Sequence, residues 1–294
     1  MHAATLLFLL LSPVTIATLN VRRALAPGGY RDKVNIYEVP GGGSLARIGN
    51  EIHVLGANGT VVHKATAGSP LKARPPSKVP ALLSSDDDDS VIHIFTYWIN
   101  VICSPYALFT GSWRVPFVPE SDDGQTLFWV QDLEEYPGDT ALMTVLQYGV
   151  SEAGGGPFYS ASTWYRDPMN IFHTTPIRTE TGVLMESIIT LTSASPFGAE
   201  TFDYNAQFTN IPGTSMNVTG VAQLNWASIA FEVFNEKDNS DYPVGITFFE
   251  DVNLKLQNGV RPDVFWPGYV YEPEQIMLDA VTQGSTNAQL RLIY

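Results

Sequence analysis

Most of the residues in this chain whose side chains could do chemistry are carboxylic acids. The chain has 30 Asp and Glu residues against 16 Lys and Arg, with a formal net charge of −14. Only His93 and His173 follow residue 85, and Cys103 is the single cysteine. There is no H-E-x-x-H, Cys/His cluster, G-x-S-x-G or Asp-Thr/Ser-Gly loop. This predicts carboxyl and amide chemistry without a metal or cofactor, and the negative charge argues against a nucleic-acid partner.

Two of these carboxyls, Asp132 and Glu134, fall on the same face of one predicted strand, because side chains alternate between the faces of a strand. Sandwich-type glycosidases place two carboxyls in this way, one acting as acid and the other as base or nucleophile. The pair therefore leaves a carbohydrate-directed function open as one interpretation.

The elements that must position these side chains are β-strands. From residue 91 onward, short runs rich in Val, Ile, Phe, Tyr, Trp and Thr alternate with Gly, Pro, Asn and Asp, and no long amphipathic helix is evident. Runs at this spacing predict an all-β domain, a β-sandwich of two antiparallel sheets. The predicted strands are 91–100, 112–115, 126–131, 141–148, 159–165, 184–192, 201–209, 226–234, 252–256 and 288–294.

The chain divides into three parts by composition and charge. Residues 1–17 are typical of a secretory signal peptide, with an apolar run too short to span a bilayer. Residues 18–89 form a basic leader that ends in a Pro-rich linker, and residues 90–294 form the acidic domain. We therefore expect a secreted, extracellular protein without a membrane anchor. Asn58 and Asn217 begin Asn-x-Thr triplets and are then glycosylation acceptors.

The basic leader has two interpretations. It could dock on the acidic domain and be released when carboxylates protonate below about pH 4, as in an acid-activated zymogen. Alternatively, the strand-like runs 34–39 and 51–62 could form a small accessory β subdomain.

Five segments of the acidic domain occur in the order of the motifs of one known family. They resemble, in turn, the Trp-Val segment, the I-L-Q-x-G motif, the aromatic Y-D-A-W-Y-E-W-Y segment, the N-L-T-T-G hairpin and the glutamate-bearing strand of the fungal glutamic peptidases, or eqolisins. The segments are 128–130, 145–149, 159–165, 209–214 and 226–234. The resemblance implies a jelly-roll, concanavalin A-like sandwich of two curved antiparallel sheets.

The resemblance also implies a function: a secreted acid endopeptidase in which a glutamine and a glutamate hydrolyse peptide bonds. Gln147 is the candidate glutamine and Glu232 the candidate glutamate. Trp129, Trp164 and Tyr165 would line peptide subsites. Partial burial would raise the pKa of a carboxyl at Glu232, and the Gln147 amide could hold the attacking water and stabilise the oxyanion.

The sequence departs from the family's N-A-E-F/W-I-x-E pattern. The most direct register aligns Ser228 with the catalytic glutamate and Glu232 with the second acid, and an upstream register aligns Gln223. Thr163 stands where the aromatic segment has its acid. A divergent member with a shifted acid and a relative without the chemistry both remain open.

A second interpretation is a non-catalytic or carbohydrate-directed sandwich that resembles concanavalin-type lectins and glucanases, with Trp129 and Trp164 stacking on sugar. A third is the same fold recruited to another conversion. The expected partner is thus a polypeptide or a glycan, and we expect a monomer.

Overall fold

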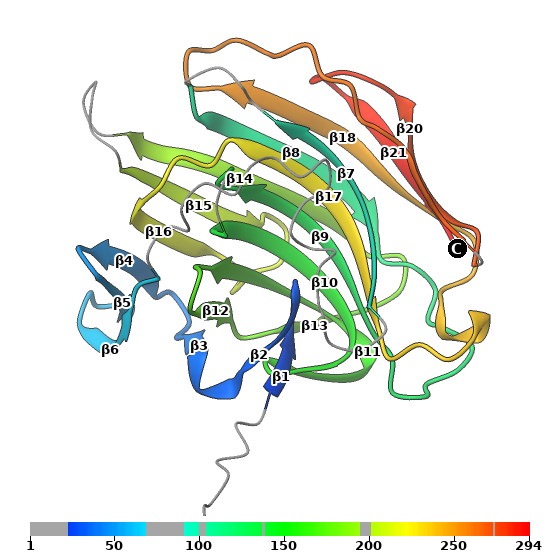
Figure 1. Ribbon diagram of the computed structural model, residues 1–294, viewed down its shortest axis with the longest axis horizontal. Helices are drawn as coiled ribbons and strands as arrows, with labels where there is room; N and C mark the ends of the chain where they lie inside the picture. Colours follow the sequence, from blue (N-terminus) through cyan, green and yellow to red (C-terminus); the bar gives the residue numbers. More distant parts are fainter. Residues whose placement is uncertain (1–22, 69–90, 100–103, 137–138, 195–200, 273) are drawn as a thin grey trace, which may run out of the picture.

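The computed structural model describes residues 23–68, 91–99, 104–136, 139–194, 201–272 and 274–294. These residues form strands and two short 3-10 helices, η1 (Lys33–Asn35) and η3 (Asn239–Asp241), with no α-helix among them. Figure 1 shows two strongly curved layers of strands stacked on each other. The predicted all-β sandwich is therefore confirmed. No helix in the described ranges is long and apolar enough to cross a membrane, and the predicted signal peptide lies outside these ranges.

The first sheet has the strand order β3, β12, β11, β10, β9, β17, β7, and β13 pairs with β11. Its neighbours are antiparallel except β3 and β12, which are parallel. Its strands are β3 (Ile36–Val39), β7 (Val91–Ile99), β9 (Thr126–Glu134), β10 (Ala141–Ser151), β11 (Gly154–Arg166), β12 (Ile171–Thr174), β13 (Ile177–Thr179) and β17 (Trp226–Phe234).

The second sheet has the strand order β19, β20, β21, β18, β8, β14, β15, β16, β4, β5, β6. Its strands are β4 (Ser44–Ile48), β5 (Glu51–Leu55), β6 (Val61–Thr66), β8 (Tyr106–Arg114), β14 (Leu184–Ala194), β15 (Phe202–Phe208), β16 (Met216–Val221), β18 (Ile246–Leu256), β19 (Tyr269–Tyr271), β20 (Ile276–Thr282) and β21 (Ala288–Ile293).

The main core lies between the two sheets. Strand β21 shows how the sequence builds it, because Ala288, Leu290 and Leu292 are buried while the residues between them are half-exposed. Trp113 and Trp129 are among the largest fully buried side chains of this core. Burial of such side chains is the main driving force that holds the sheets together.

The outer face of the first sheet is buried as well, because β9, β10 and β17 are covered on both sides. A hairpin of β1 (Arg23–Ala26) and β2 (Gly29–Asp32), blue in Figure 1, packs on this face. Leu25 and Ala26 of the hairpin join a second apolar cluster with Phe128, Val145 and Trp164. We call this surface the covered face.

Strands β3 to β6, also within the leader, extend both sheets. Strand β3 pairs in parallel with β12, and β4 pairs in parallel with β16. Leu45 and Val54 are buried in the main core. The run 51–62, expected as one strand, is instead a hairpin: β5 and β6 are separated by a turn in which Gly59 has φ 78° and Asn58 Oδ1 accepts from the Thr60 amide at 3.1 Å.

Candidate active site

The strand register brings the two candidate residues into one row on the covered face. Gln147 of β10 lies opposite Phe128 of β9, and Phe128 lies opposite Glu232 of β17. Directly paired residues in antiparallel strands share a face. Gln147 and Glu232 therefore point to the same side from different strands, two strand spacings or about 10 Å apart.

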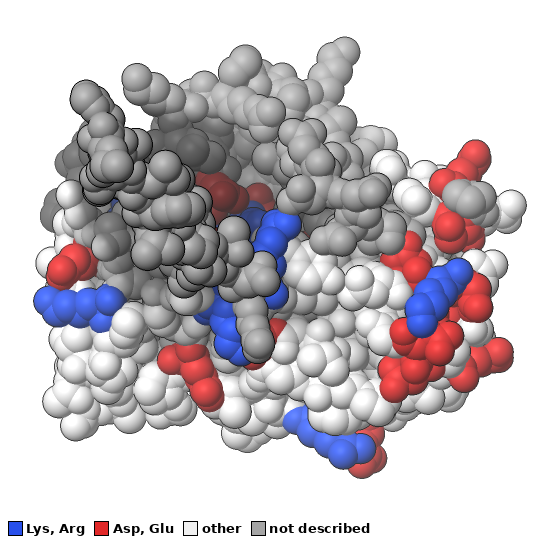
Figure 2. Space-filling model, turned by 60° about the horizontal axis from the view of Figure 1, so that its bottom comes forward, with Lys and Arg blue, Asp and Glu red and all other residues white. Residues whose placement is uncertain are grey.

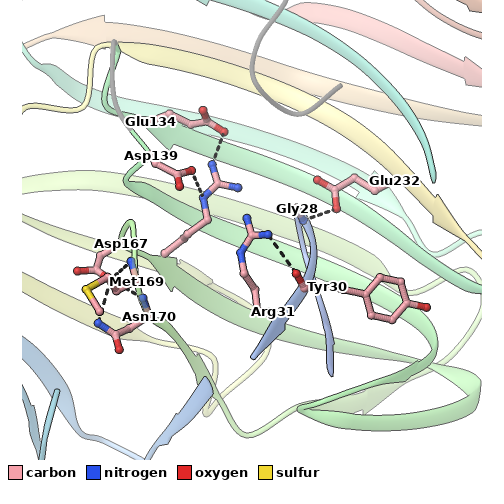
Figure 3. Close-up of polar contacts among 10 residues, drawn as sticks. Gly28, Tyr30, Arg31, Glu134, Asp139, Asp167, Met169, Asn170 and Glu232 are labelled. Atoms are coloured by element: carbon pink, nitrogen blue, oxygen red, sulfur yellow. Dashed lines mark hydrogen bonds and ion pairs between the residues drawn. The ribbon is translucent and has the colours of Figure 1, made fainter. Parts of the chain in front are cut away.

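Glu232 binds a peptide N–H of the chain's own leader. Its carboxyl is buried, and Oε2 accepts from the backbone amide of Gly28 at 2.7 Å (Figure 3). Gly28 and Gly29 both have positive φ, 81° and 107°, which glycine adopts without strain. The Gly-Gly pair thus lets the hairpin turn bring a backbone N–H onto the carboxyl.

The Gln147 amide is engaged locally. Its Oε1 accepts from the Ser151 hydroxyl, and its Nε2 donates to the carbonyls of Gly149 and Gly154, each at 2.8 Å. The amide is fully buried against Gly155, where an added Cβ would lie 2.4 Å from Nε2. In the form described here Gln147 therefore holds the β10–β11 turn together.

A carboxyl also lies next to Ser228, the residue aligned with the family's glutamate in the direct register. The Ser228 hydroxyl donates to Asp132 Oδ1 at 2.7 Å, and both groups are buried on the covered face. Burial, followed by the charge of Glu134, raises the pKa of Asp132 well above its usual value, and burial likewise raises the pKa of Glu134. The covered face thus holds a pair of carboxyls that retain protons more tightly than exposed ones.

Arginines lie beside these carboxyls. Arg166 of β11 is only 4% exposed and lies 3.4 Å from Glu134 and 3.4 Å from Asp139. Arg31 of the hairpin points toward the same region (Figure 3) and is affected by the charges of Arg166, Asp139 and Glu232. Figure 2 shows basic side chains beside acidic ones in the middle of this view, partly behind residues drawn in grey.

The three aromatic candidates are divided between two environments. Trp129 and Tyr165 lie in the main core between the sheets, where Trp129 Nε1 donates to the Tyr294 hydroxyl at 2.6 Å. Trp164 lies on the covered face and donates to Ser162 Oγ at 2.7 Å. Only Trp164 of the three shares a face with Glu232.

Sequence reasoning did not find Arg31, Asp139 or Arg166 as members of this site. Asp132 and Glu134 were noticed only as a same-face pair. The alternation of side chains along the strand correctly placed both on one face of β9. The position of Arg166 in the sequence gives no indication that β11 brings its side chain to Glu134. The glycosylation candidates Asn58 and Asn217 are both exposed.

Within the described ranges, no group of three or more His, Cys, Asp or Glu side chains could hold a metal ion. On the covered face, Glu232 can bind a peptide N–H, and Asp132 and Glu134 can donate and accept protons.

Neither a protein-family model nor a curated protein matches the sequence. Among solved structures, scytalido-glutamic peptidase with a peptide-based transition-state analogue matches at 13% identity and TM-score 0.45, covering 69% of this chain and 97% of that one. SCP-B, a member of the eqolisin family of peptidases in complex with the tripeptide Ala-Ile-His, matches at 12% identity and TM-score 0.44, with the same coverage. These belong to the family that the sequence motifs resemble.

Proposed function

We propose that this protein is a secreted, monomeric endopeptidase that acts in acid, with its site on the covered face of the first sheet. Glu232 is the reacting acid and Gln147 its partner in the same row. The observation that carries the proposal is the 2.7 Å hydrogen bond from the Gly28 peptide N–H to Glu232. A carboxyl that already binds the backbone of a polypeptide segment is placed to act on peptides.

The chemistry requires one carboxyl and one amide. Water adds to the scissile carbonyl carbon while the Glu232 carboxylate takes its proton. The same carboxyl then gives a proton to the amide nitrogen as the C–N bond breaks. The Gln147 N–H stabilises the oxyanion, for which the β10–β11 turn must release the amide from its carbonyl partners.

In this proposal the form described here is latent. The β1–β2 hairpin occupies the covered face, with Leu25 buried and Gly28 on the reacting carboxyl. A substrate reaches Glu232 only after the hairpin leaves. Strands β3 to β6 stay in place, because they pair with both sheets.

A carbohydrate-directed function is the second candidate, because Asp132 and Glu134 lie on one face of β9 and both have raised pKa values. Val130 occupies the next position on that face and is apolar. Stacking of sugar on Trp129 and Trp164 is the weaker part of this candidate, because both side chains are fully buried. The peptidase proposal is therefore preferred.

The test is proteolysis by the purified full chain across acidic pH, on a denatured protein substrate. We expect cleavage only in acid, unaffected by chelators and by pepstatin, because the proposed site uses neither a metal nor an aspartic dyad of the Asp-Thr/Ser-Gly type. Absence of cleavage at every acidic pH would refute the proposal. Binding to a glycan array would then support the second candidate.

A further inference from the structure

The β1–β2 hairpin contacts the β10–β11 turn as well as Glu232. In this turn, the backbone N–H of Glu152 donates to the carbonyl of Leu25 in β1 at 2.8 Å. The Lys33 ammonium, just after β2, lies 2.8 Å from the Glu152 carboxylate. The turn is therefore bound to the hairpin by a backbone hydrogen bond, and to the residue that follows the hairpin by an ion pair.

The same turn holds the side-chain amide of Gln147. Strand β10 ends at Ser151 and β11 begins at Gly154, so Glu152 and Ala153 form the whole connection. The Ser151 hydroxyl donates to Gln147 Oε1 at 2.8 Å and accepts from the Ala153 N–H at 3.2 Å. The Gly154 carbonyl accepts from Gln147 Nε2 at 2.8 Å. The amide is thus bonded to the residue before Glu152 and to the second residue after it.

The conformation of this turn makes it depend on contacts outside itself. The two-residue turns that suit a β-hairpin best need a positive φ at the first central residue or at both. Neither Glu152 nor Ala153 has one. Ala153 instead packs against the second apolar cluster, to which Leu25 and Ala26 of β1 belong. Departure of the hairpin would expose apolar surface of Ala153 and break the Glu152–Leu25 hydrogen bond, and both changes destabilise the closed turn.

We propose that Glu152 is a positioning residue, through which the docked hairpin keeps the Gln147 amide in its latent arrangement. Docking holds the turn closed at Glu152, and the closed turn bonds to Gln147. The hairpin also binds the Glu232 carboxyl directly. Release of the hairpin therefore frees both groups of the proposed reaction in one event. The inference rests on the proposed function, because that function is what assigns Gln147 and Glu232 to one reaction.

The experiment is hydrogen exchange of the full chain, followed by NMR at neutral pH without substrate. The Gly28 N–H, which donates to Glu232, reports on the hairpin. The side-chain NH₂ of Gln147 reports on the turn, and its signal is identified by its loss in Gln147→Met. Segments that open as one unit exchange with one opening free energy. We therefore expect equal opening free energies for the two groups in wild type.

The first variant loosens the hairpin and leaves the Glu152 N–H in place. Tyr30 fixes the hairpin to β17, since its ring lies 6.2 Å from that of Phe234 and its hydroxyl donates to Asn235 at 3.2 Å. We expect Tyr30→Ala to speed the exchange of both reporter groups by the same factor of about ten. Tyr271→Ala, the same change at a half-exposed position of β19 in the second sheet, should leave both rates unchanged.

The second variant breaks the contact from the side of the turn. Glu152→Pro removes the N–H that Leu25 accepts and leaves the residues bonded to Gln147 unchanged. Proline suits the first central position of a turn, and Ser151 before it lies in a strand, as proline prefers. We expect the Gln147 NH₂ to exchange about ten times faster than in wild type. Glu152→Gln, which keeps the N–H and loses only the ion pair, is the matched control and should stay within about twofold of wild type.

Two results would overturn the proposal. In the first, the Gly28 N–H exchanges with a lower opening free energy than the Gln147 NH₂ in wild type or in Tyr30→Ala, so that the hairpin leaves while the turn stays closed. In the second, the Gln147 NH₂ exchanges as slowly in Glu152→Pro as in Glu152→Gln. Failure of the proposed function is a separate result, because absence of proteolysis in acid would leave these exchange rates as they are.

Discussion

At the scale of single residues, the polar groups of the covered face differ in how many hydrogen bonds they would have to break before they could contact a substrate. Glu232 accepts from a backbone N–H of the β1–β2 hairpin, which in our proposal leaves the covered face. Gln147 is held by three hydrogen bonds within its own turn. Asp132 is tied to Ser228 and buried. Glu232 therefore needs less rearrangement than Gln147 to take part in the proposed reaction.

Asp132 gives a prediction for stability against pH. Its pKa is raised in the folded state, so the folded protein holds this proton more tightly than the unfolded chain does. Stability must then fall as the pH rises from about 3.9, the usual value, through the raised pKa. We expect Asp132→Asn to reduce this fall, measured as the urea unfolding free energy from pH 4 to 7. Asp263→Asn, at an exposed position, is the control. If the unfolding free energy falls with pH equally steeply in both variants, Asp132 is not the group responsible.

Gln147 gives a prediction for folding. Replacing it with Met leaves the Ser151 hydroxyl and the carbonyls of Gly149 and Gly154 without their partner. The expected loss is about 1–3 kcal/mol of unfolding free energy. Gln289→Met, at a half-exposed position with one bond of 3.1 Å to Glu250, should change stability by no more than about 0.5 kcal/mol. Urea unfolding of both variants measures the two losses. A Gln147→Met variant as stable as the control would contradict the role of Gln147 in holding the β10–β11 turn.

At the scale of elements, we expect the β1–β2 hairpin to leave the covered face in acid. Burial first, and then repulsion from Arg166, lowers the pKa of Arg31, while Asp139 and Glu232 oppose this and Arg23 adds to the repulsion. At neutral pH the two carboxylates offset the contact between like charges. Carboxyl groups in general lose their charge in strong acid. The repulsion between Arg31 and Arg166 is then no longer offset, which favours release of the hairpin.

This predicts that Arg31→Gln keeps the hairpin docked to a lower pH than wild type. Hydrogen exchange of residues 23–32 between pH 3 and 7 measures the midpoint of opening, which should move down by about one pH unit, equivalent to 1.4 kcal/mol. Arg114→Gln, the same change of charge at an exposed site on the second sheet, should leave the midpoint unchanged. A midpoint that stays in place, or moves up, in Arg31→Gln argues against the repulsion.

Strand prediction succeeded where a segment alternates and is well paired. The range 226–234 coincides with β17, and 126–131 and 141–148 lie within β9 and β10. Strand β18 begins at Ile246, six residues before the predicted start, because a bulge at Asp251 with φ 51° interrupts its pattern. Short strands such as β12 and β19 give too few residues for a period to show.

The site was less accessible to sequence reasoning than the fold. The alternation of 226–234 put Ser228 and Glu232 on one face, as the structure has them. That Gln147 shares their face depends on the register of β10, β9 and β17, of which β17 lies far from the other two in the sequence. A shift by one residue would reverse it. The contact of Gly28 with Glu232 spans 204 residues and has no local signal.

At the scale of the whole molecule, the described part of the leader, residues 23–68, contacts the sandwich in two ways. Strands β3 to β6 complete the sheets, with Val39 and Ile52 buried in the main core. The β1–β2 hairpin lies on the covered face. The accessory-strand interpretation of the leader thus fits β3 to β6, and removal remains a proposal for the β1–β2 hairpin.

A prediction about processing follows. The secreted protein should begin near Thr18, and acid treatment should cut it between about Pro70 and Asp89. Because β3 and β4 pair with β12 and β16, the fragment containing them should co-elute with the acidic domain in gel filtration at neutral pH and in acid. N-terminal sequencing identifies the cuts, and a leader fragment that elutes alone in acid would show that β3 to β6 are not part of the sandwich.

The most direct test of the account is proteolysis by Glu232→Gln beside wild type in acid, with cleavage products identified by mass spectrometry. The substitution keeps an oxygen that can accept from Gly28, so the fold should survive, as unfolding curves will show. We predict that Glu232→Gln abolishes turnover while Glu250→Gln, at an exposed carboxyl on β18, cleaves like wild type. Full activity in Glu232→Gln would contradict the central claim.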